Sequence, residues 1–416
     1  MALVQRIDAW RNASDERLEK LRRVADFLVV GIAAALPWST SVLSILLAAW
    51  ILAVIPTIRF AELKETLRLP AAYLPVAIFL LALLGLLWAD VEWKERLQGL
   101  SPFLKLAAVP VLITQFRNST NGRAVFIAFL VSCCALLIAS TLTAVFPSEL
   151  GRFGKHPGIL VKDRISQSTM FLIAAMGFIY VSLDSFRRSD HRWFVGGALL
   201  AAAFLVNIMF VSTSRTILLS IPIVGLVLLM SMFREYRWHA LVVSIVAVLI
   251  ASALIWQSSS ATRDRVLAIA HEINAYNEDD VRTSSGERIE FWKKSAQFVT
   301  EAPIIGHGTA STRTLFEKVA SQQSGASGLV TSNPHNQILA AAVQFGAIGV
   351  LLLLAMWAAH AGLLRVAGVA GAAIAIIFTQ HLIGSLFNSH LFDFTHGWLY
   401  VVGIGVAAGM ALRAAR

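Results

Sequence analysis

The sequence predicts an all-α, polytopic integral membrane protein with about twelve transmembrane helices. Three observations carry this prediction. Of the 416 residues, 57% are hydrophobic and only 14% are charged, far from the balance of a soluble globular protein. Apolar runs of about twenty residues, long enough to span a bilayer, recur along the chain. Arginine and lysine gather in alternate connections between these runs, as they do in cytoplasmic loops.

The apolar runs are the expected membrane spans, taken in order along the chain. Pro37, Trp38 and Ser39 mark the boundary between the first two runs, which predicts a tight hairpin. The second, fourth and sixth runs are short, so their ends are the hardest to place. The runs cover residues 25–38, 40–56, 71–89, 101–116, 124–146, 168–184, 193–211, 215–233, 238–256, 336–359, 366–387 and 397–413.

The basic residues predict the orientation. The polar N-terminal stretch and the segments around Lys64, Arg188 and Arg234 fall on one side when the chain crosses twelve times. Basic loops stay in the cytoplasm, so we expect both termini there. The net charge of +10 is then explained by these loops, and no nucleic-acid partner is expected.

One long polar segment interrupts the apolar pattern. Residues 1–256 are expected to hold spans one to nine, 257–335 a large helical loop on the opposite side, and 336–416 spans ten to twelve. Within the loop, Ser284-Ser285-Gly286-Glu287 resembles a capping box that begins a helix. That helix is expected to carry an apolar stripe, and the residues of the stripe are Ile289, Trp292, Ala296 and Val299.

Several cations lie at the expected outer side, where the orientation rule does not place them. They are Lys105 within the fourth span, Arg215 at the start of the eighth, and Arg152, Lys155, Lys162 and Arg164 after the fifth. A cation at membrane depth is costly, although snorkelling or a structural ion pair explains any single one equally well. Together they predict a basic cavity that receives a phosphorylated lipid headgroup.

Arg215 and Arg288 are the sharpest candidates for binding an anion. Arg215 begins a helix, where the helix dipole disfavours a cation unless an anion is bound there. Arg288 lies about 40° from Trp292 on a helical wheel, at the edge of the apolar stripe. We therefore expect both guanidinium groups to face a buried or half-buried anion.

His335 lies in SNPHNQIL, directly before the tenth span. Asn333 is expected to be the N-cap and Pro334 the first helical residue, which places His335 in the first turn. The helix dipole would lower the pKa of this histidine and keep it neutral, as a general base requires. A histidine that only hydrogen-bonds the loop explains the same residues equally well.

A second polar cluster, His390, Asp393 and His396, precedes the last span. The third residue has turned about 240° from the first on a helix, which disfavours a metal site. We prefer an outer loop in which Asp393 orients a catalytic group or an arginine, with an interfacial turn as the alternative. Motifs for Walker A, Rossmann, zincin, serine-hydrolase and D-x-D sites are missing from the sequence, so no cofactor and no metal are expected.

The stretches SSGERIEFWKKSAQFVTEAPIIGHG (284–308) and SNPHNQIL (332–339) resemble the O-antigen ligase family, which includes O-antigen polymerases and bacterial O-oligosaccharyltransferases. The shared pattern is R-x3-W, P-x2-G-x-G and P-H-N. The resemblance implies a glycosyltransferase type C-like fold in the Gram-negative inner membrane. It implies metal-independent, inverting transfer of O-antigen from undecaprenyl pyrophosphate to lipid A–core at the periplasmic face. It maps the family's functional residues to Arg215, Arg288 and His335.

The preferred interpretation is thus an O-antigen ligase of lipopolysaccharide biosynthesis with His335 as general base. The further residues expected to bind the substrate or its pyrophosphate are Arg265, Lys105, Arg152, Arg164, Asn336 and Asp393. The alternatives are an O-antigen polymerase, a protein O-oligosaccharyltransferase or, from another class, a non-enzymatic lipid-linked glycan transporter. The end of the chain directly after the last span favours a ligase or a polymerase, and the lack of an inverted repeat disfavours the transporter. Monomer and homodimer both stay open.

Overall fold

The computed structural model describes residues 2–150, 156–161, 163–236, 238–239, 241–242, 245–246, 249, 257, 260–320 and 325–416. Within these residues the regular structure is helical, apart from one isolated bridge between His156 and Ile159. Nine of the described helical segments are long and apolar enough to cross a membrane, or ten if a bent pair counts as one span. The prediction of an all-α polytopic membrane protein is confirmed.

The helices follow one another with short connections except around the large loop. In the first part of the chain they are α1 (Ala2–Ala35), α2 (Thr40–Val54), α3 (Phe60–Thr66), α4 (Pro70–Leu84), α5 (Trp93–Leu104), α6 (Ala108–Asn118), α7 (Gly122–Val145), α8 (Pro147–Leu150), α9 (Arg164–Arg187), α10 (His191–Phe210) and α11 (Arg215–Met232). The later helices are α13 (Ser260–Asp279), α14 (Ser284–Glu301), α15 (Ser311–Ala320), α16 (Gln337–Gly362), α17 (Gly368–Phe387) and α18 (Phe394–Ala414). Short 3₁₀ turns are η1 (Ile55–Thr57), η2 (Lys105–Ala107), η4 (Arg234–Tyr236) and η5 (Leu363–Arg365).

Three of the twelve predicted spans differ from the membrane-length helices. Run 25–38 is the end of α1, a 34-residue helix whose earlier turns are charged. Run 71–89 contains α4, which follows α3 at a bend of 95°. Run 238–256 lies largely outside the described residues. The other nine runs coincide with the nine helical segments of membrane length.

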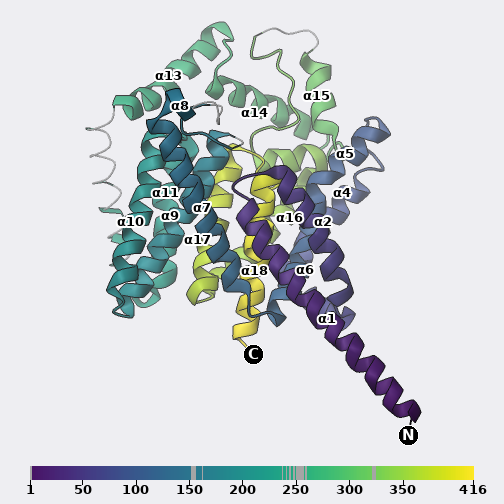
Figure 1. The fold of residues 1–416 in the computed structure, drawn as a ribbon. Helices are drawn as coiled ribbons and strands as arrows, with labels where there is room; N and C mark the ends of the chain where they lie inside the picture. The colour runs from purple at the N-terminus through teal and green to yellow at the C-terminus, as the bar shows by residue number, and fades with distance from the viewer. Residues whose placement is uncertain are drawn as a thin grey trace.

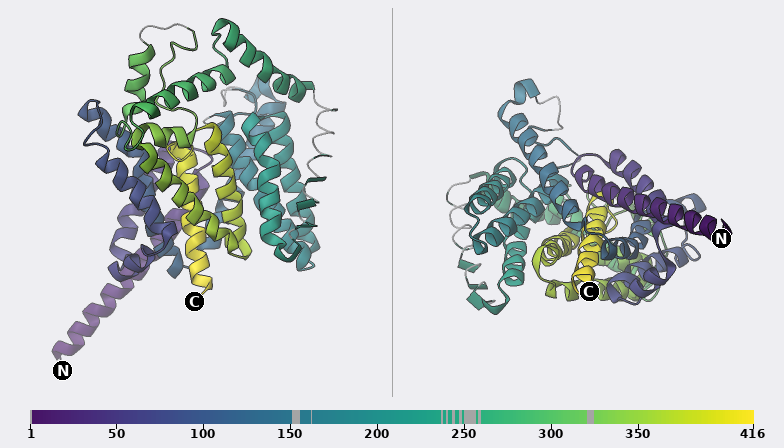
Figure 2. Two further views of the ribbon diagram at one scale, coloured as in Figure 1. Left: turned by 180° about the vertical axis from the view of Figure 1, so that it is seen from behind. Right: turned by 60° about the horizontal axis from the view of Figure 1, so that its bottom comes forward.

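The chain termini and the large loop lie at opposite ends of the helix bundle. Figure 1 shows the N- and C-termini below the bundle and α13, α14 and α15 above it. The view from behind in Figure 2 shows the same separation. We call these two ends the terminal end and the loop end. This arrangement agrees with the predicted placement of both termini on one side and of 257–335 on the other.

Apolar packing holds the spans together. α6 packs along α18, α9 along α10, α11 along α17, and α4 along α16, while α1 contacts α2 and α7. Large side chains such as Trp50, Phe116 and Phe204 are fully buried between these helices. Apolar side chains on the outer surface, such as Leu52 and Phe210, are exposed in the isolated chain and face the positions that lipid occupies in a bilayer.

A break in α16 at Gly346 attaches the loop to the bundle. Gly346 has φ 58° and ψ −151°, which interrupts the helix, and a Cβ there would lie 2.4 Å from the carbonyl carbon of Ile304. The segment 303–308, PIIGHG, runs beside this break. The backbone N–H of His307 donates to the carbonyl of Val343 at 2.9 Å. The glycine-containing segment therefore supplies hydrogen-bond partners that the interrupted helix loses.

Candidate functional site

Arg215 begins α11 at the loop end and forms a two-point ion pair with Glu272 of α13. Its Nη1 lies 3.0 Å from Glu272 Oε2 and its Nη2 lies 2.7 Å from Oε1. The hydroxyl of Ser285 donates to the same carboxylate at 2.6 Å. Hydrogen bonding from Arg215 is the main cause that lowers the pKa of Glu272 to about 2, so this carboxylate is ionised at neutral pH. The pair links α11, α13 and the first turn of α14.

α14 begins one residue earlier than the predicted capping box. Thr283 is the N-cap, in an extended backbone conformation, and its hydroxyl accepts the N–H of Gly286 at 3.0 Å. The box expected from Ser284 to Glu287 is therefore wrong, because the N3 position is occupied by a glycine. The predicted beginning of a helix at this point is correct.

The buried face of α14 also differs from the predicted stripe. Phe291 and Phe298 are buried in a small apolar cluster with residues of α15 and α16, whereas Ala296 is exposed. Glu290 and Lys294 lie on the buried face and pair at 3.3 Å. Charged residues are rarely buried unless they are paired. The two charged residues therefore made this face look solvent-exposed in the sequence.

Arg288 lies one turn into α14 and is half-buried. Within the described part of the chain, its guanidinium makes no hydrogen bond and no ion pair. Burial lowers the pKa of Arg288, the neighbouring charge of Arg215 lowers it further, and Glu272 opposes both. The group stays protonated because an arginine does not lose its proton in proteins. A half-buried cation that lacks a directly bonded counter-ion has the chemistry to bind an anion.

His335 lies before α16, not in its first turn. The N-cap is Asn336, whose side-chain oxygen accepts two N–H groups of the first turn at 2.9 and 3.0 Å. His335 has a left-handed backbone with φ 55°, and its N–H donates to the side chain of Asn333 at 2.9 Å. The predicted cap of Asn333 and Pro334 is therefore wrong, because the side chain of Asn333 is used inside the preceding turn.

The ring of His335 packs against α14. It stacks on Phe291 with ring centroids 5.8 Å apart and an interplanar angle of 16°. Burial is the main cause that lowers the pKa of His335, and the charge of Arg288 lowers it further, while a hydrogen bond with Asn388 opposes them. The direction agrees with the sequence prediction. The cause differs, since it is burial and Arg288 rather than the dipole of α16.

The connection between α17 and α18 holds the histidine segment in place. The side chain of Asn333 donates to that of Asn388 at 2.6 Å. The backbone N–H of Leu391 donates to the side chain of Gln337 at 2.8 Å. These bonds join the residues on both sides of His335 to the segment that carries Asn388.

Lys105 is buried against the backbone of the segment that carries Asp393, whose own side chain is 42% exposed. Lys105 is 3% exposed, and its ammonium group donates to the backbone carbonyl of Asp393 at 2.5 Å. The side chain of Asp393 caps α18 and accepts both the N–H and the ring Nδ1–H of His396 at 2.8 Å. These groups use their hydrogen bonds locally, and the phosphate contact expected for Lys105 stays a prediction. Among the described residues, no three His, Cys, Asp or Glu side chains are placed to hold a metal ion.

The remaining predicted residues are spread more widely. Asn336 uses its side chain as the N-cap of α16 and also donates to the carbonyl of Leu386 at 3.1 Å. Arg164 begins α9 and is exposed, without a contact to Arg215, Arg288 or His335 among the described residues. Of Arg265 only its place on α13 is described, and Arg152, Lys155 and Lys162 lie outside the described residues.

A cavity of about 460 Å³ lies beside the histidine segment at the loop end. It is bounded by α5, α15 and the segments before α16 and α18. Its polar lining residues are Glu95, Gln98, Thr312, Arg313, Ser332, Asn333, Gln344, Ser389 and Asp393. Many hydrogen-bond donors and acceptors around one cavity suit a ligand rich in hydroxyl groups.

Arg215 and His335 both contact α14, through Ser285 and Phe291, and Arg288 lies between these two positions on the same helix. The sequence analysis missed Glu272 and Asn388. Glu272 is one of many acidic residues in a loop of mixed charge, and nothing in its local pattern marks it. Asn388 stands two residues before the histidine cluster, but asparagine in a loop is common.

Comparison with known proteins finds similarity in the same part of the chain. Residues 200–354 match the family model described as O-Antigen ligase, and this region contains all three candidate residues with Glu272. The chain is also 26% identical over 181 residues to an uncharacterized protein of Haemophilus influenzae. That alignment covers 42% of this chain and 45% of the relative, so the chain spans less than half of the relative's length. Residues 200–354 are thus similar to the O-antigen ligase family, which supports assigning the chain to it.

Proposed function

We propose that this protein is an O-antigen ligase. It transfers O-antigen polysaccharide from undecaprenyl pyrophosphate to lipid A–core, with the loop end in the periplasm and the terminal end in the cytoplasm of a Gram-negative cell. The observation that carries the proposal is the unpaired, half-buried Arg288 between Arg215 and His335, inside the region that matches the family.

The charges of the site suit a pyrophosphate. Arg215 and Glu272 neutralise each other, so Arg288 leaves the group with one uncompensated positive charge. A pyrophosphate diester carries two negative charges, and guanidinium groups bind phosphate oxygens in two-point geometry. In this proposal Arg288 binds the donor first and Arg215 shares its guanidinium between Glu272 and the phosphate. The two arginines then stabilise the charge that develops on the leaving group.

His335 is the proposed base. Its lowered pKa keeps the ring neutral near pH 7, and packing on Phe291 fixes its plane. The ring takes the proton of an acceptor sugar hydroxyl, and that oxygen attacks the anomeric carbon of the donor. The bond between the anomeric carbon and the pyrophosphate oxygen breaks, and undecaprenyl pyrophosphate leaves with the electron pair. Attack opposite the leaving group inverts the anomeric centre.

The cavity of about 460 Å³ is the proposed place of the acceptor core sugars. Asn333 lines this cavity and its side chain accepts the backbone N–H of His335, so the segment that carries the proposed base forms part of the cavity wall. Holding the acceptor and the donor at one interface removes much of the entropic barrier to their reaction. Lys105, Asn336 and Asp393 then act by fixing the walls of the site, which is what their contacts support.

The test is transfer by the purified protein in vitro. Undecaprenyl-pyrophosphate glycan and lipid A–core are mixed with the wild type, His335→Ala and Arg288→Gln, in the presence of EDTA. His191→Ala serves as the control, because His191 is exposed at the start of α10 and remote from the loop. We expect EDTA-resistant ligation that His335→Ala abolishes and His191→Ala retains.

Three outcomes would contradict the proposal. If the glycan lengthens on its own lipid without joining the core, the protein is a polymerase. If peptide hydroxyls accept the glycan and lipid A–core does not, it is a protein O-oligosaccharyltransferase. If a folded His335→Ala variant ligates at nearly the wild-type rate, His335 is not the base.

A further inference from the structure

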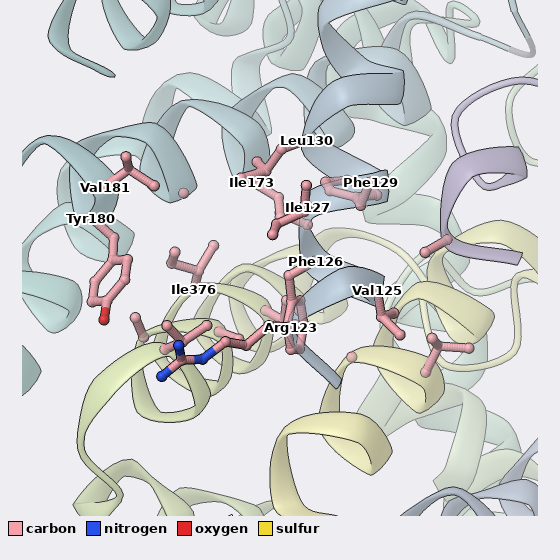
Figure 3. A pocket seen from close by; sticks show the side chains of 18 of the residues that line it. Arg123, Val125, Phe126, Ile127, Phe129, Leu130, Ile173, Tyr180, Val181 and Ile376 are labelled. Carbon is pink, nitrogen blue, oxygen red and sulfur yellow. The ribbon is translucent and has the colours of Figure 1, made fainter. Parts of the chain in front are cut away.

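A second site lies at the terminal end, away from the residues described above. It begins as an apolar groove of about 260 Å³ between α1, α7, α9, α17 and α18. Figure 3 shows its side chains, among them Val125, Phe129, Ile173 and Ile376. Ile127, which also lines the groove, is 59% exposed. Since α7 is a helix of membrane length, the open side of the groove faces the bilayer.

The groove has a polar end. Arg123, in the first turn of α7, extends across it, and Figure 3 shows its guanidinium on the side where the hydroxyl of Tyr180 lies. Arg123 is exposed and makes no hydrogen bond or ion pair within the described part of the chain. The nearby carboxylate of Asp184 is already paired with Arg188 at 3.0 Å. The groove therefore ends at a cation whose charge is not neutralised by the described residues.

A polar pocket of about 460 Å³ continues from this end of the groove. The groove and the pocket share Tyr180 and Asp184 as lining residues. Arg187 lies over the ring of Phe233 at 4.3 Å, and Arg234 donates to the backbone carbonyls of Leu364 and Val366, before α17. Neither guanidinium is paired with a carboxylate among the residues that the structure describes. Arg187 and Arg234 thus line the polar pocket together with the acidic Asp184 and Glu235, and Arg123 lies at the end of the adjoining apolar groove.

We propose that the groove and the pocket form one binding site for an anionic phospholipid of the surrounding bilayer. An acyl chain lies in the groove, and the headgroup phosphate lies among Arg123, Arg187 and Arg234. The groove opens toward lipid, so a lipid reaches it without leaving the membrane. Basic pockets between transmembrane helices bind anionic headgroups, because guanidinium pairs well with phosphate in this partly desolvated region. The site is independent of the proposed transfer reaction.

The experiment measures lipid retention by native mass spectrometry of the purified full chain. Phosphatidylglycerol and phosphatidylcholine with identical acyl chains are added to the protein in detergent. We expect preferential retention of phosphatidylglycerol, and Arg123→Gln should weaken it about fivefold, as the loss of one basic contact predicts. Arg192→Gln is the matched control, because Arg192 lies at the same end and outside both linings. It should leave retention unchanged.

A groove-filling variant tests the acyl chain separately. Ala373 lines the groove and is half-buried, so Ala373→Phe fills it while leaving Arg123 in place. Retention of both lipids should then fall. Equal retention of the two lipids by the wild type, or wild-type retention by Arg123→Gln, would overturn the proposal. So would an Ala373→Phe variant that changes the oligomeric mass and keeps the lipid, because the groove would then be an interface between copies. Arg123 makes no hydrogen bond or ion pair within the described part of the chain, so Arg123→Gln should fold. This variant therefore tests the lipid site even if Ala373→Phe does not fold.

Discussion

The ion pair between Arg215 and Glu272 predicts a pH-dependent difference in stability at the loop end. The substitution is Glu272→Gln, which keeps the shape of the side chain and removes its charge. The pKa of Glu272 falls from an ordinary 4.5 to about 2 in the folded protein. At about 1.4 kcal/mol per pKa unit, this shift corresponds to about 3 kcal/mol. Because the two side chains are 35% and 20% exposed, solvent screening reduces the expected loss to about 1–2 kcal/mol.

The sign of the pH dependence follows from the lowered pKa. The carboxylate stabilises the folded state fully above pH 4.5, and this contribution is lost as the pH falls from 4.5 toward 2. The difference in free energy of opening between wild type and Glu272→Gln should therefore be constant near pH 7. It should decrease as the pH falls below 4.5. Hydrogen exchange of the amides of α13 and α14 measures it, with both proteins compared at the same pH.

Glu317→Gln on α15 is the matched control. Glu317 pairs with Arg313 at 2.8 Å, but the two side chains are 47% and 67% exposed. An exposed pair one turn apart contributes about 0.5 kcal/mol or less. Exchange in Glu272→Gln that equals wild type at pH 7, or a gap that stays the same at pH 3, would show that the pair does not hold the loop helices together.

Three further predictions concern the histidine and the break in α16. Arg288→Gln removes a charge that lowers the pKa of His335, so the acid limb of the transfer rate should move to higher pH, and Arg288→Lys should not move it. Asn388→Ala removes the hydrogen bond that opposes this lowering. The acid limb should move to lower pH, and kcat should fall about tenfold with KM little changed, whereas an unaltered pH profile would exclude this role. Gly346→Ala should destabilise the fold by more than about 1–3 kcal/mol in thermal unfolding, because φ is 58° and its Cβ would clash with a backbone. Gly362→Ala, with nothing within 4 Å, should unfold like wild type.

Much of the fold was predictable because a membrane span is a local property of the sequence. A window of apolar residues determines that a helix crosses the bilayer, and nine predicted runs coincide with helical segments of that length. The bend of 95° between α3 and α4 was not predictable. It depends on how two short helices pack against the rest of the bundle, and no local pattern encodes that. The full length of α1 was missed because its first half is too charged to be recognised as part of a membrane span.

The candidate site was predictable residue by residue but not as an arrangement. Arg215 and His335 stood out because they lie at the ends of membrane helices, and Arg288 because it lies at the edge of a predicted apolar stripe. Their partners, Glu272 and Asn388, come from segments far along the chain, and only the tertiary structure selects them. The cap of α16 was misplaced because two asparagines, at 333 and 336, both fit the pattern. Geometry decides between them, since only Asn336 reaches the free N–H groups of the first turn.

The arginine, the two glycines and the histidine of the quoted pattern lie on three segments that contact one another. These segments are α14, residues 303–308 and the residues directly before α16. Arg288 and Phe291 lie early on α14, facing His335. The end of α14 runs into the segment 303–308, which is docked on the break in α16 at Gly346. The start of α16 carries His335 and is tied to the last two spans. Both ends of α14 are thus positioned by one interrupted helix. A side chain at Gly346 would displace the segment 303–308 and with it α14. Arg288 would then move away from His335, although neither residue contacts the substituted position. Substitution at Gly346 should therefore impair transfer and stability together, whereas substitution at Arg288 should impair transfer alone.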